Sequence, residues 1–204
     1  EWGRLKMQAS VLGYFVHEKV ERFEAWPDKA VATPAFFGSF KVLKNHDLSV
    51  RAFYKRMFRM PTFNDLYYTD MGNAFLKPEY AEQFNVGLKY TRNFEKSPFM
   101  RMLDVSVDAY YNKITDKIIA YPKGQQFRWT MLNLGEVEIK GVDAVLNTQF
   151  SLGKLEVTTK FQYTYQEAID VTDPADTYYR DQIPYIPWHS GSAILALFYN
   201  CLLY

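Results

Sequence analysis

Long segments of strictly alternating apolar and polar residues constrain this chain more than any other feature. The clearest runs from residue 103 to 112, where the apolar set and the polar set are Leu103, Val105, Val107, Ala109, Tyr111 and Asp104, Ser106, Asp108, Tyr110, Asn112. Successive side chains of a β-strand point to opposite faces, so a period of two indicates strands with one apolar and one polar face.

The same pattern predicts about eight strands, near residues 5–17, 36–43, 48–58, 83–92, 103–112, 127–150, 155–166 and 188–199. The sixth strand changes parity, because Val137 and Ile139 are odd whereas the apolar set from Val142 onward is even. A bulge near Lys140-Gly141 would add one residue and restore a common apolar face. We therefore expect an all-β antiparallel meander with that bulge in its sixth strand.

The connections between these strands alternate between long and short. In an antiparallel meander this places every long loop at one end, which is the layout of an outer-membrane barrel. Aromatic residues fall at strand ends on the apolar face: Tyr54, Tyr111 and Tyr165 toward the long loops, and Tyr90, Phe150 and Tyr199 toward the short turns. Two aromatic girdles at the membrane interfaces are the expected result. The predicted fold is part of a large transmembrane β-barrel.

Composition excludes several other classes of protein. The net charge is +1, whereas a nucleic-acid partner would require a basic stripe. No apolar run reaches the roughly 18 residues of a transmembrane helix. A soluble sandwich would share the alternation, but its strands usually run only about 5 to 6 residues.

The size of the barrel leaves two alternatives. A self-contained eight-stranded barrel, acting as a lipid enzyme or adhesion protein, would need its first and last strands to pair. An open sheet would leave unpaired edges in lipid, which a bilayer does not tolerate. The small and polar residues of the inner face, such as Gly87, Ser106 and Thr158, favour a fragment of a larger barrel.

Four ordered motifs support a resemblance to a known family. They are Phe58-Arg59-Met60-Pro61 followed by Leu76-Lys77-Pro78-Glu79, then residues 110–118, then Asn133 with Lys140-Gly141-Val142-Asp143, and finally Ile183-Pro184-Tyr185-Ile186-Pro187. Together they resemble the barrel part of TonB-dependent outer-membrane receptors, with Asp143 where that family more often has Glu. The composition is most similar to receptors of the Bacteroidetes type.

This resemblance implies a 22-stranded barrel in the outer membrane of a Gram-negative bacterium, closed by an N-terminal plug domain. Residues 1–204 would be a partial barrel domain, with the plug and the closing strands outside it. The implied function is TonB-dependent uptake of a scarce bulky nutrient, such as an iron-siderophore or cobalamin, without enzymatic activity. The implied partners are outer-membrane lipid, the plug, the TonB complex acting through the plug, and the imported ligand, but no nucleic acid.

Ten residues are candidates for ligand binding. Arg51, Lys55 and Arg59 share a parity and form a basic row on the inner face, which could attract an anionic ligand or pair with acidic residues of a plug. The aromatic and amide candidates are Asn64, Tyr67, Tyr68, Asn73, Trp26, Tyr178 and Tyr179. These seven could contact ligand or could only order the loops.

No catalytic or metal-binding motif is present, and no cofactor is expected. Asp104 and Asp108 share the inner face, but wet barrel interiors commonly carry such carboxylates. His17, His46 and His189 lack the spacing of metal ligands. Because no His lies between Arg59 and Leu76, haem ligation in that loop is not expected.

Overall fold

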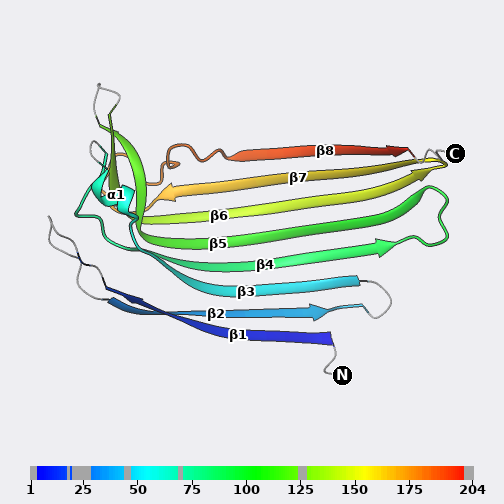
Figure 1. Ribbon diagram of the computed structural model, residues 1–204, viewed down its shortest axis with the longest axis horizontal. Coiled ribbons are helices and arrows are strands. Elements are labelled where there is room, and N and C mark those ends of the chain that lie inside the picture. Colours follow the sequence, from blue (N-terminus) through cyan, green and yellow to red (C-terminus); the bar gives the residue numbers. More distant parts are fainter. Residues whose placement is uncertain are drawn as a thin grey trace.

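The computed structural model describes residues 4–17, 19, 29–43, 47–68, 71–123 and 128–199. These residues form one antiparallel sheet whose strands follow chain order, with a short helix at one end (Figure 1). The elements are β1 (Leu5–Val16), β2 (Lys29–Lys41), β3 (Asp47–Arg59), α1 (Phe63–Tyr67), β4 (Glu79–Asn93), β5 (Met100–Lys123), β6 (Arg128–Leu152), β7 (Leu155–Asp170) and β8 (His189–Tyr199). The predicted all-β meander is confirmed.

The sheet has a long-loop end and a short-turn end, although the connection between β5 and β6, expected to be long, is mostly an extension of these two strands. In Figure 1 the helix α1 lies at the left, at the long-loop end, and the turns that follow β4 and β6 lie at the right. Among the described strands, β1 pairs with β2 and β8 pairs with β7, so β1 and β8 are the two edges of an open sheet. This arrangement is not the closed eight-stranded barrel of the alternative.

Several strands extend beyond their predicted limits, β2 and β5 the furthest. β2 begins at Lys29 and includes Pro34, which stands opposite Val11 where pairing of β2 with β3 ends. Proline has no amide N–H, so it is tolerated where one side of a strand needs no ladder partner. β5 and β6 stay paired up to Lys123 and Arg128, so most of the segment expected to connect the fifth and sixth strands is part of a long hairpin instead.

The predicted bulge at Lys140-Gly141 is wrong. β6 keeps an uninterrupted register with β7 through these residues, and the register shift between β5 and β6 lies at the other end, between Met100 and Met102. Val137 and Ile139 therefore lie on the polar face, opposite to the apolar set that starts at Val142. They are buried there because other parts of the chain cover that end of the face.

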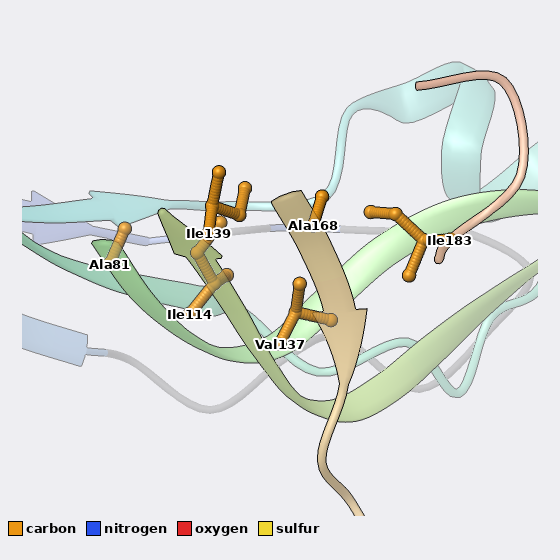
Figure 2. Close-up of a cluster of buried hydrophobic side chains, with 6 residues drawn as sticks. All are labelled: Ala81, Ile114, Val137, Ile139, Ala168 and Ile183. Atoms are coloured by element: carbon orange, nitrogen blue, oxygen red, sulfur yellow. The ribbon is translucent and has the colours of Figure 1, made fainter. Parts of the chain in front are cut away.

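The main buried cluster lies on the polar face near the long loops. It consists of Ala81, Ile114, Val137, Ile139, Ala168 and Ile183 (Figure 2). Ile183 comes from the connection before β8, and its N–H donates to the carbonyl of Ala168 at 2.8 Å. A second cluster joins Leu66, Leu76 and Ile118. We call this covered region the dry half of the polar face.

The opposite face carries an apolar stripe that no part of the described chain covers. We call it the outward stripe, and we call this face of the sheet the outward face. The central residues of the stripe are all exposed and include Val86, Leu88, Val107, Val142 and Phe161. Leu88, midway along β4, is 51% exposed. Burying apolar surface is the main driving force of folding, so an uncovered stripe of this length needs an apolar surrounding. Among the described residues, no helix has the length and apolar character needed to cross a membrane.

Aromatic rings border the outward stripe at both ends. Toward the long loops, Phe36, Tyr54, Phe84 and Tyr111 stand side by side on four neighbouring strands, with ring centroids 6.4, 4.9 and 6.3 Å apart. Toward the short turns, the rings of Phe99 and Phe150 lie 5.1 Å apart. Tyr54 and Tyr111 lie on the outward face as predicted, but they are not at strand ends, because β3 continues to Arg59 and β5 to Lys123. We call Phe36, Tyr54, Phe84 and Tyr111 the aromatic row.

Candidate ligand-facing surface

The polar face near the short turns carries paired charges. Arg51, Gly87, Asp108 and Asp143 stand in one cross-strand row from β3 to β6. The Arg51 guanidinium spans Gly87 to form two hydrogen bonds with Asp108, one of them from Nε to Oδ1 at 3.0 Å. Gly87 permits this approach, because a Cβ there would meet the Asp108 carboxylate. Arg51 is therefore neutralised within the sheet itself.

The second inner carboxylate is also satisfied by its neighbours. Asp104 accepts hydrogen bonds from Thr91 at 2.7 Å and Asn147 at 3.1 Å, and the ammonium of Lys89 lies 3.3 Å away. Asp104 and Asp108 thus have separate cationic partners and do not face each other as an acid–base pair. We call the region that holds Arg51, Lys89, Asp104, Asp108 and Asp143 the open half of the polar face.

The basic row divides into three different environments. Arg59, at the end of β3, lies 3.3 Å from Asp65 and 3.5 Å from Glu79, so two carboxylates hold it. Lys55 is exposed and has no ion-pair partner among the described residues. Both Lys55 and Arg59 line a cavity of about 350 Å³ on the polar face between β1 and β4. Of the three bases, Lys55 remains available to an anionic group.

The segment between β3 and β4 is ordered by a capped helical turn. Thr62 is the N-cap of α1: its hydroxyl accepts from the Asp65 N–H at 3.2 Å, and the Asp65 carboxylate accepts from the Thr62 N–H at 2.8 Å. This reciprocal capping box satisfies donors that a helix start leaves open. The same Asp65 carboxylate contacts Arg59, so the motif Phe58-Arg59-Met60-Pro61 anchors the helix that follows it.

Two asparagines attach this segment to the β5–β6 hairpin. Asn133 donates to the carbonyls of Lys77 at 3.0 Å and Asp116 at 2.7 Å, and accepts from the Lys77 N–H at 2.8 Å. Asn73 donates to the Met131 carbonyl at 3.0 Å. The Glu79 carboxylate accepts from the Ile118 N–H at 3.1 Å. The residues of the sequence motifs therefore fix the shape of the segment.

Gly72 marks the tightest point of this segment. A Cβ at Gly72 would lie 2.6 Å from the Tyr68 nitrogen and 2.7 Å from the Leu66 carbonyl oxygen. Both neighbours are backbone atoms that cannot move aside cheaply, so glycine is required for this close approach. Residues 60–68 and 71–78 are consequently packed together, with Leu66 and Leu76 buried among them.

The structure places the other predicted residues in different surroundings. Asn64, Tyr68 and Tyr178 are exposed, whereas Tyr179 is half-buried. Tyr67 is half-buried against the cluster of Leu66, Leu76 and Ile118. Trp26 lies outside the described residues. All those described lie at the long-loop end, and their contact with ligand stays a prediction.

Exposed aromatic residues at the long-loop end add candidates that sequence reasoning missed. Phe75 is 91% exposed and Phe63 is 73% exposed, and both belong to the segment fixed by Asn73 and Asn133. Tyr185, in the connection before β8, is also exposed. Phe63 directly follows Thr62, the N-cap of a helix too short to have a buried stripe. Its place in the capping sequence Thr62-Phe63-Asn64-Asp65 is a sequence signal that could have predicted its exposure. We call Phe63, Tyr68, Phe75, Tyr178 and Tyr185 the aromatic crown.

No group of three or more potential metal ligands occurs among the residues that the structure describes. His189 lies on the outward face, where its Nδ1 is 2.8 Å from the Tyr163 hydroxyl. His46 and Cys201 lie outside the described ranges.

Comparison with known proteins identifies the family of this chain. The sequence model of the family described as "TonB dependent receptor-like, beta-barrel" matches residues 16–200. The chain is 32% identical over 99 residues to the vitamin B12 transporter BtuB of Vibrio vulnificus, covering 48% of this chain and 14% of that protein. It is 34% identical over 113 residues to the vitamin B12 transporter BtuB of Photobacterium profundum, covering 52% of this chain and 16% of that protein.

The matched region is a small part of these curated relatives. The Bacteroidetes-type resemblance stays a prediction. The match over residues 16–200 covers most of the chain and agrees with the open eight-stranded meander. The chain belongs to the TonB-dependent receptor family, of which it forms part of the β-barrel.

Proposed function

We propose that this chain contributes eight strands to the barrel of an outer-membrane receptor that imports a scarce, bulky nutrient. The outward stripe contacts lipid tails, and the polar face lines the interior of the barrel. The observation that carries this proposal is the contrast between the faces: Leu88 and its neighbours are uncovered, while Arg51, Asp104 and Asp108 carry charge on the opposite side. A charge facing lipid at the midplane of a barrel costs about 2–4 kcal/mol, so only this orientation is stable.

The remaining strands and the plug are supplied by parts of the receptor outside residues 1–204. Within the part of the chain that the structure describes, the edges β1 and β8 carry unpaired backbone groups on one side, and a bilayer requires these groups to be hydrogen-bonded. Additional strands satisfy both edges, and the plug fills the polar interior and couples the receptor to the TonB complex. The receptor moves its ligand without enzymatic chemistry.

A cross-linking experiment tests this partial-barrel arrangement. Cysteines are introduced at Gln8 on β1 and Ala196 on β8 of the full-length receptor in membranes. These strands are separated by other strands in a large barrel, so we expect no disulfide between them under oxidising conditions. A Lys41–Ser49 cysteine pair, directly opposite on the paired strands β2 and β3, is the positive control. A cross-link between β1 and β8 would instead indicate a closed eight-stranded barrel.

The ligand that we propose is a corrinoid of the vitamin B12 type. Both reported relatives are named vitamin B12 transporters. The aromatic crown offers flat apolar surfaces at the long-loop end, which suit a large, partly apolar macrocycle. Arg51 and Arg59 are held by carboxylates, which leaves Lys55 to meet the single phosphodiester of such a ligand. This balance favours a weakly charged ligand over a strongly anionic siderophore.

Uptake of labelled cyanocobalamin tests the proposed ligand. The full-length receptor is expressed in a strain that lacks its own cobalamin receptor. Phe75→Ala should weaken binding roughly tenfold, because a well-placed aromatic contact contributes about 1–2 kcal/mol. Phe99→Ala, which removes an exposed ring at the short-turn end, should leave uptake unchanged. Absence of cobalamin uptake by the parent receptor, with uptake of ferric siderophore instead, would overturn the choice of ligand.

A further inference from the structure

A row of charges with alternating sign crosses the outward face just beyond the aromatic row. Arg56 on β3, Glu82 on β4, Lys113 on β5 and Glu138 on β6 stand directly opposite one another in register. Each lies two residues along its strand from the aromatic row or its neighbour Lys140, on the long-loop side. Two residues of a strand span about 7 Å, and neighbouring strands lie about 4.8 Å apart. The row is therefore a narrow charged belt, which we call the charge row.

The side chains of the charge row are held by local contacts. The ammonium of Lys113 lies 3.0 Å from the Glu136 carboxylate. Lys140 stands level with the aromatic row, and its ammonium reaches toward the long loops to lie 3.1 Å from Glu138. The Arg56 guanidinium lies 5.6 Å from the centre of the Tyr80 ring. Long basic side chains that extend in this way place their charge at a polar interface.

The position of the charge row marks the boundary of the hydrocarbon layer. Aromatic rings prefer the interface between tails and headgroups, and charges are tolerated only beyond it. The row faces away from the polar face, so a ligand inside the barrel cannot reach it. The molecules available to this surface are the lipids that surround the barrel.

We propose that the charge row binds the phosphorylated headgroup of a membrane lipid. Arg56, Lys113, Glu82 and Glu136 line a cavity of about 250 Å³, with Thr115 as a further hydrogen-bond donor. Arg56 and Lys113 donate to phosphate oxygens, and Glu82 and Glu136 bind divalent cations that bridge neighbouring phosphates. This inference rests on the proposed function, because it requires the outward stripe to lie in a bilayer.

Charge balance favours phosphates bridged by divalent cations. The bases of the charge row and its contacts are Arg56, Lys113 and Lys140, and the acids are Glu82, Glu136 and Glu138. Equal numbers of basic and acidic side chains suit a lipid surface that presents both anionic phosphates and divalent cations. A dense, purely anionic surface would be repelled by the three carboxylates.

Retention of a defined lipid by the full-length receptor tests the proposal. The receptor is placed in phosphatidylcholine vesicles that contain diphosphorylated lipid A and Mg²⁺, extracted with mild detergent, and analysed for bound lipid by mass spectrometry. We expect the Arg56→Gln/Lys113→Gln double variant to retain roughly tenfold less lipid A, because basic residues near a membrane attract anionic lipid additively. Lys113→Arg keeps the charge and should retain lipid A as the parent does.

A matched control uses lysines on the opposite face. Lys6→Gln/Lys160→Gln removes the same charge from the polar face and should leave retention of lipid A unchanged. Equal retention of dephosphorylated lipid A by the parent receptor would overturn the proposal. Displacement of lipid A by millimolar inorganic phosphate would indicate a site for free phosphate and would also overturn it. Flotation of the receptor with the vesicles separates these outcomes from failure of the proposed membrane location, which would abolish flotation itself.

Discussion

The two halves of the polar face belong to the same strands but differ in what covers them. In the dry half, Val137 of β6 is 0% exposed, enclosed by strand neighbours and by Ile183 of the connection before β8. In the open half, Val145 of the same strand and face is half-buried between Ser106 and Gln162, near the ion pair of Arg51 with Asp108. Identical backbone pairing thus supports two different interiors.

A period of two therefore defines the two faces of a strand but not which parts of the chain contact each face. The dry half is apolar because loops fold back over it, and the open half is polar because no described residue does. A valine on one face of β6 is therefore a core residue at one end and a residue of the barrel lining at the other. Four experiments test this comparison.

Placing a charge in the dry half should destabilise the receptor more than any other change proposed here. Val137→Asp buries a carboxylate without a partner and should cost more than about 4 kcal/mol, enough to prevent folding of the receptor. Val145→Asp makes the same change in the open half and should cost less than about 1 kcal/mol. The amount of folded receptor in the membrane fraction measures both. Equal yields of the two variants would contradict the division of the polar face into two halves.

The second experiment asks whether the opposite face meets lipid, since only then is the polar face an interior. Val86→Arg places a charge on the outward stripe near its middle and should cost about 2–4 kcal/mol in a bilayer. Urea unfolding of the full-length receptor in vesicles measures this loss, with Val86→Leu as the apolar control. A Val86→Arg variant as stable as the control would mean that water, and not lipid, contacts the stripe.

The third experiment loosens the cover of the dry half. Asn133→Ala removes two hydrogen bonds between the hairpin and Lys77 and a third within the hairpin, to the Asp116 carbonyl, and leaving these groups unpaired should cost about 1–3 kcal/mol. Limited proteolysis should then cut between residues 60 and 78 more rapidly. Asn64→Ala, at an exposed amide of the same segment, is the matched control. Similar cleavage rates for the two variants would show that Asn133 does not hold the cover.

Sequence reasoning found the strands and missed the cover. Alternation along Leu103–Tyr111 and its counterparts predicted the meander, because side-chain direction in a strand is a local property. It could not show that Ile183, far along the chain, packs onto Val137, and the odd parity of Val137 was therefore explained by a bulge that does not exist. The apolar residues at odd positions, Val137 and Ile139, indicated that part of the polar face is buried. Only tertiary contacts distinguish that burial from a register shift.

The candidate site divides in the same way. The motif residues Arg59, Glu79 and Asn133 were identifiable in sequence, but their roles were not, because each acts through a partner on another element. Arg59 was expected to face a ligand or a plug, yet Asp65 and Glu79 hold it within the chain. Exposure of Phe75 depends on the fold of the segment around Gly72 and has no periodic signature. Local pattern predicted the scaffold, and long-range contacts decided which side chains remain available.

The fourth experiment replaces one glycine of each half with alanine, and the expected losses of stability are small. Gly87→Ala directs a methyl group at the ends of the Asp108 and Arg51 side chains, which can shift, so the cost should be at most about 1 kcal/mol. The gain from a less flexible unfolded chain offsets part of that cost. Gly141→Ala, beside the dry half, meets the Tyr110 ring and lies 2.6 Å from the Tyr165 carbonyl oxygen, and should cost about 1–3 kcal/mol. Urea unfolding in vesicles measures both. A larger loss for Gly87→Ala than for Gly141→Ala would mean that the ion pair of the open half is as rigid as the packed half, and the contrast between the two halves would then be one of polarity alone.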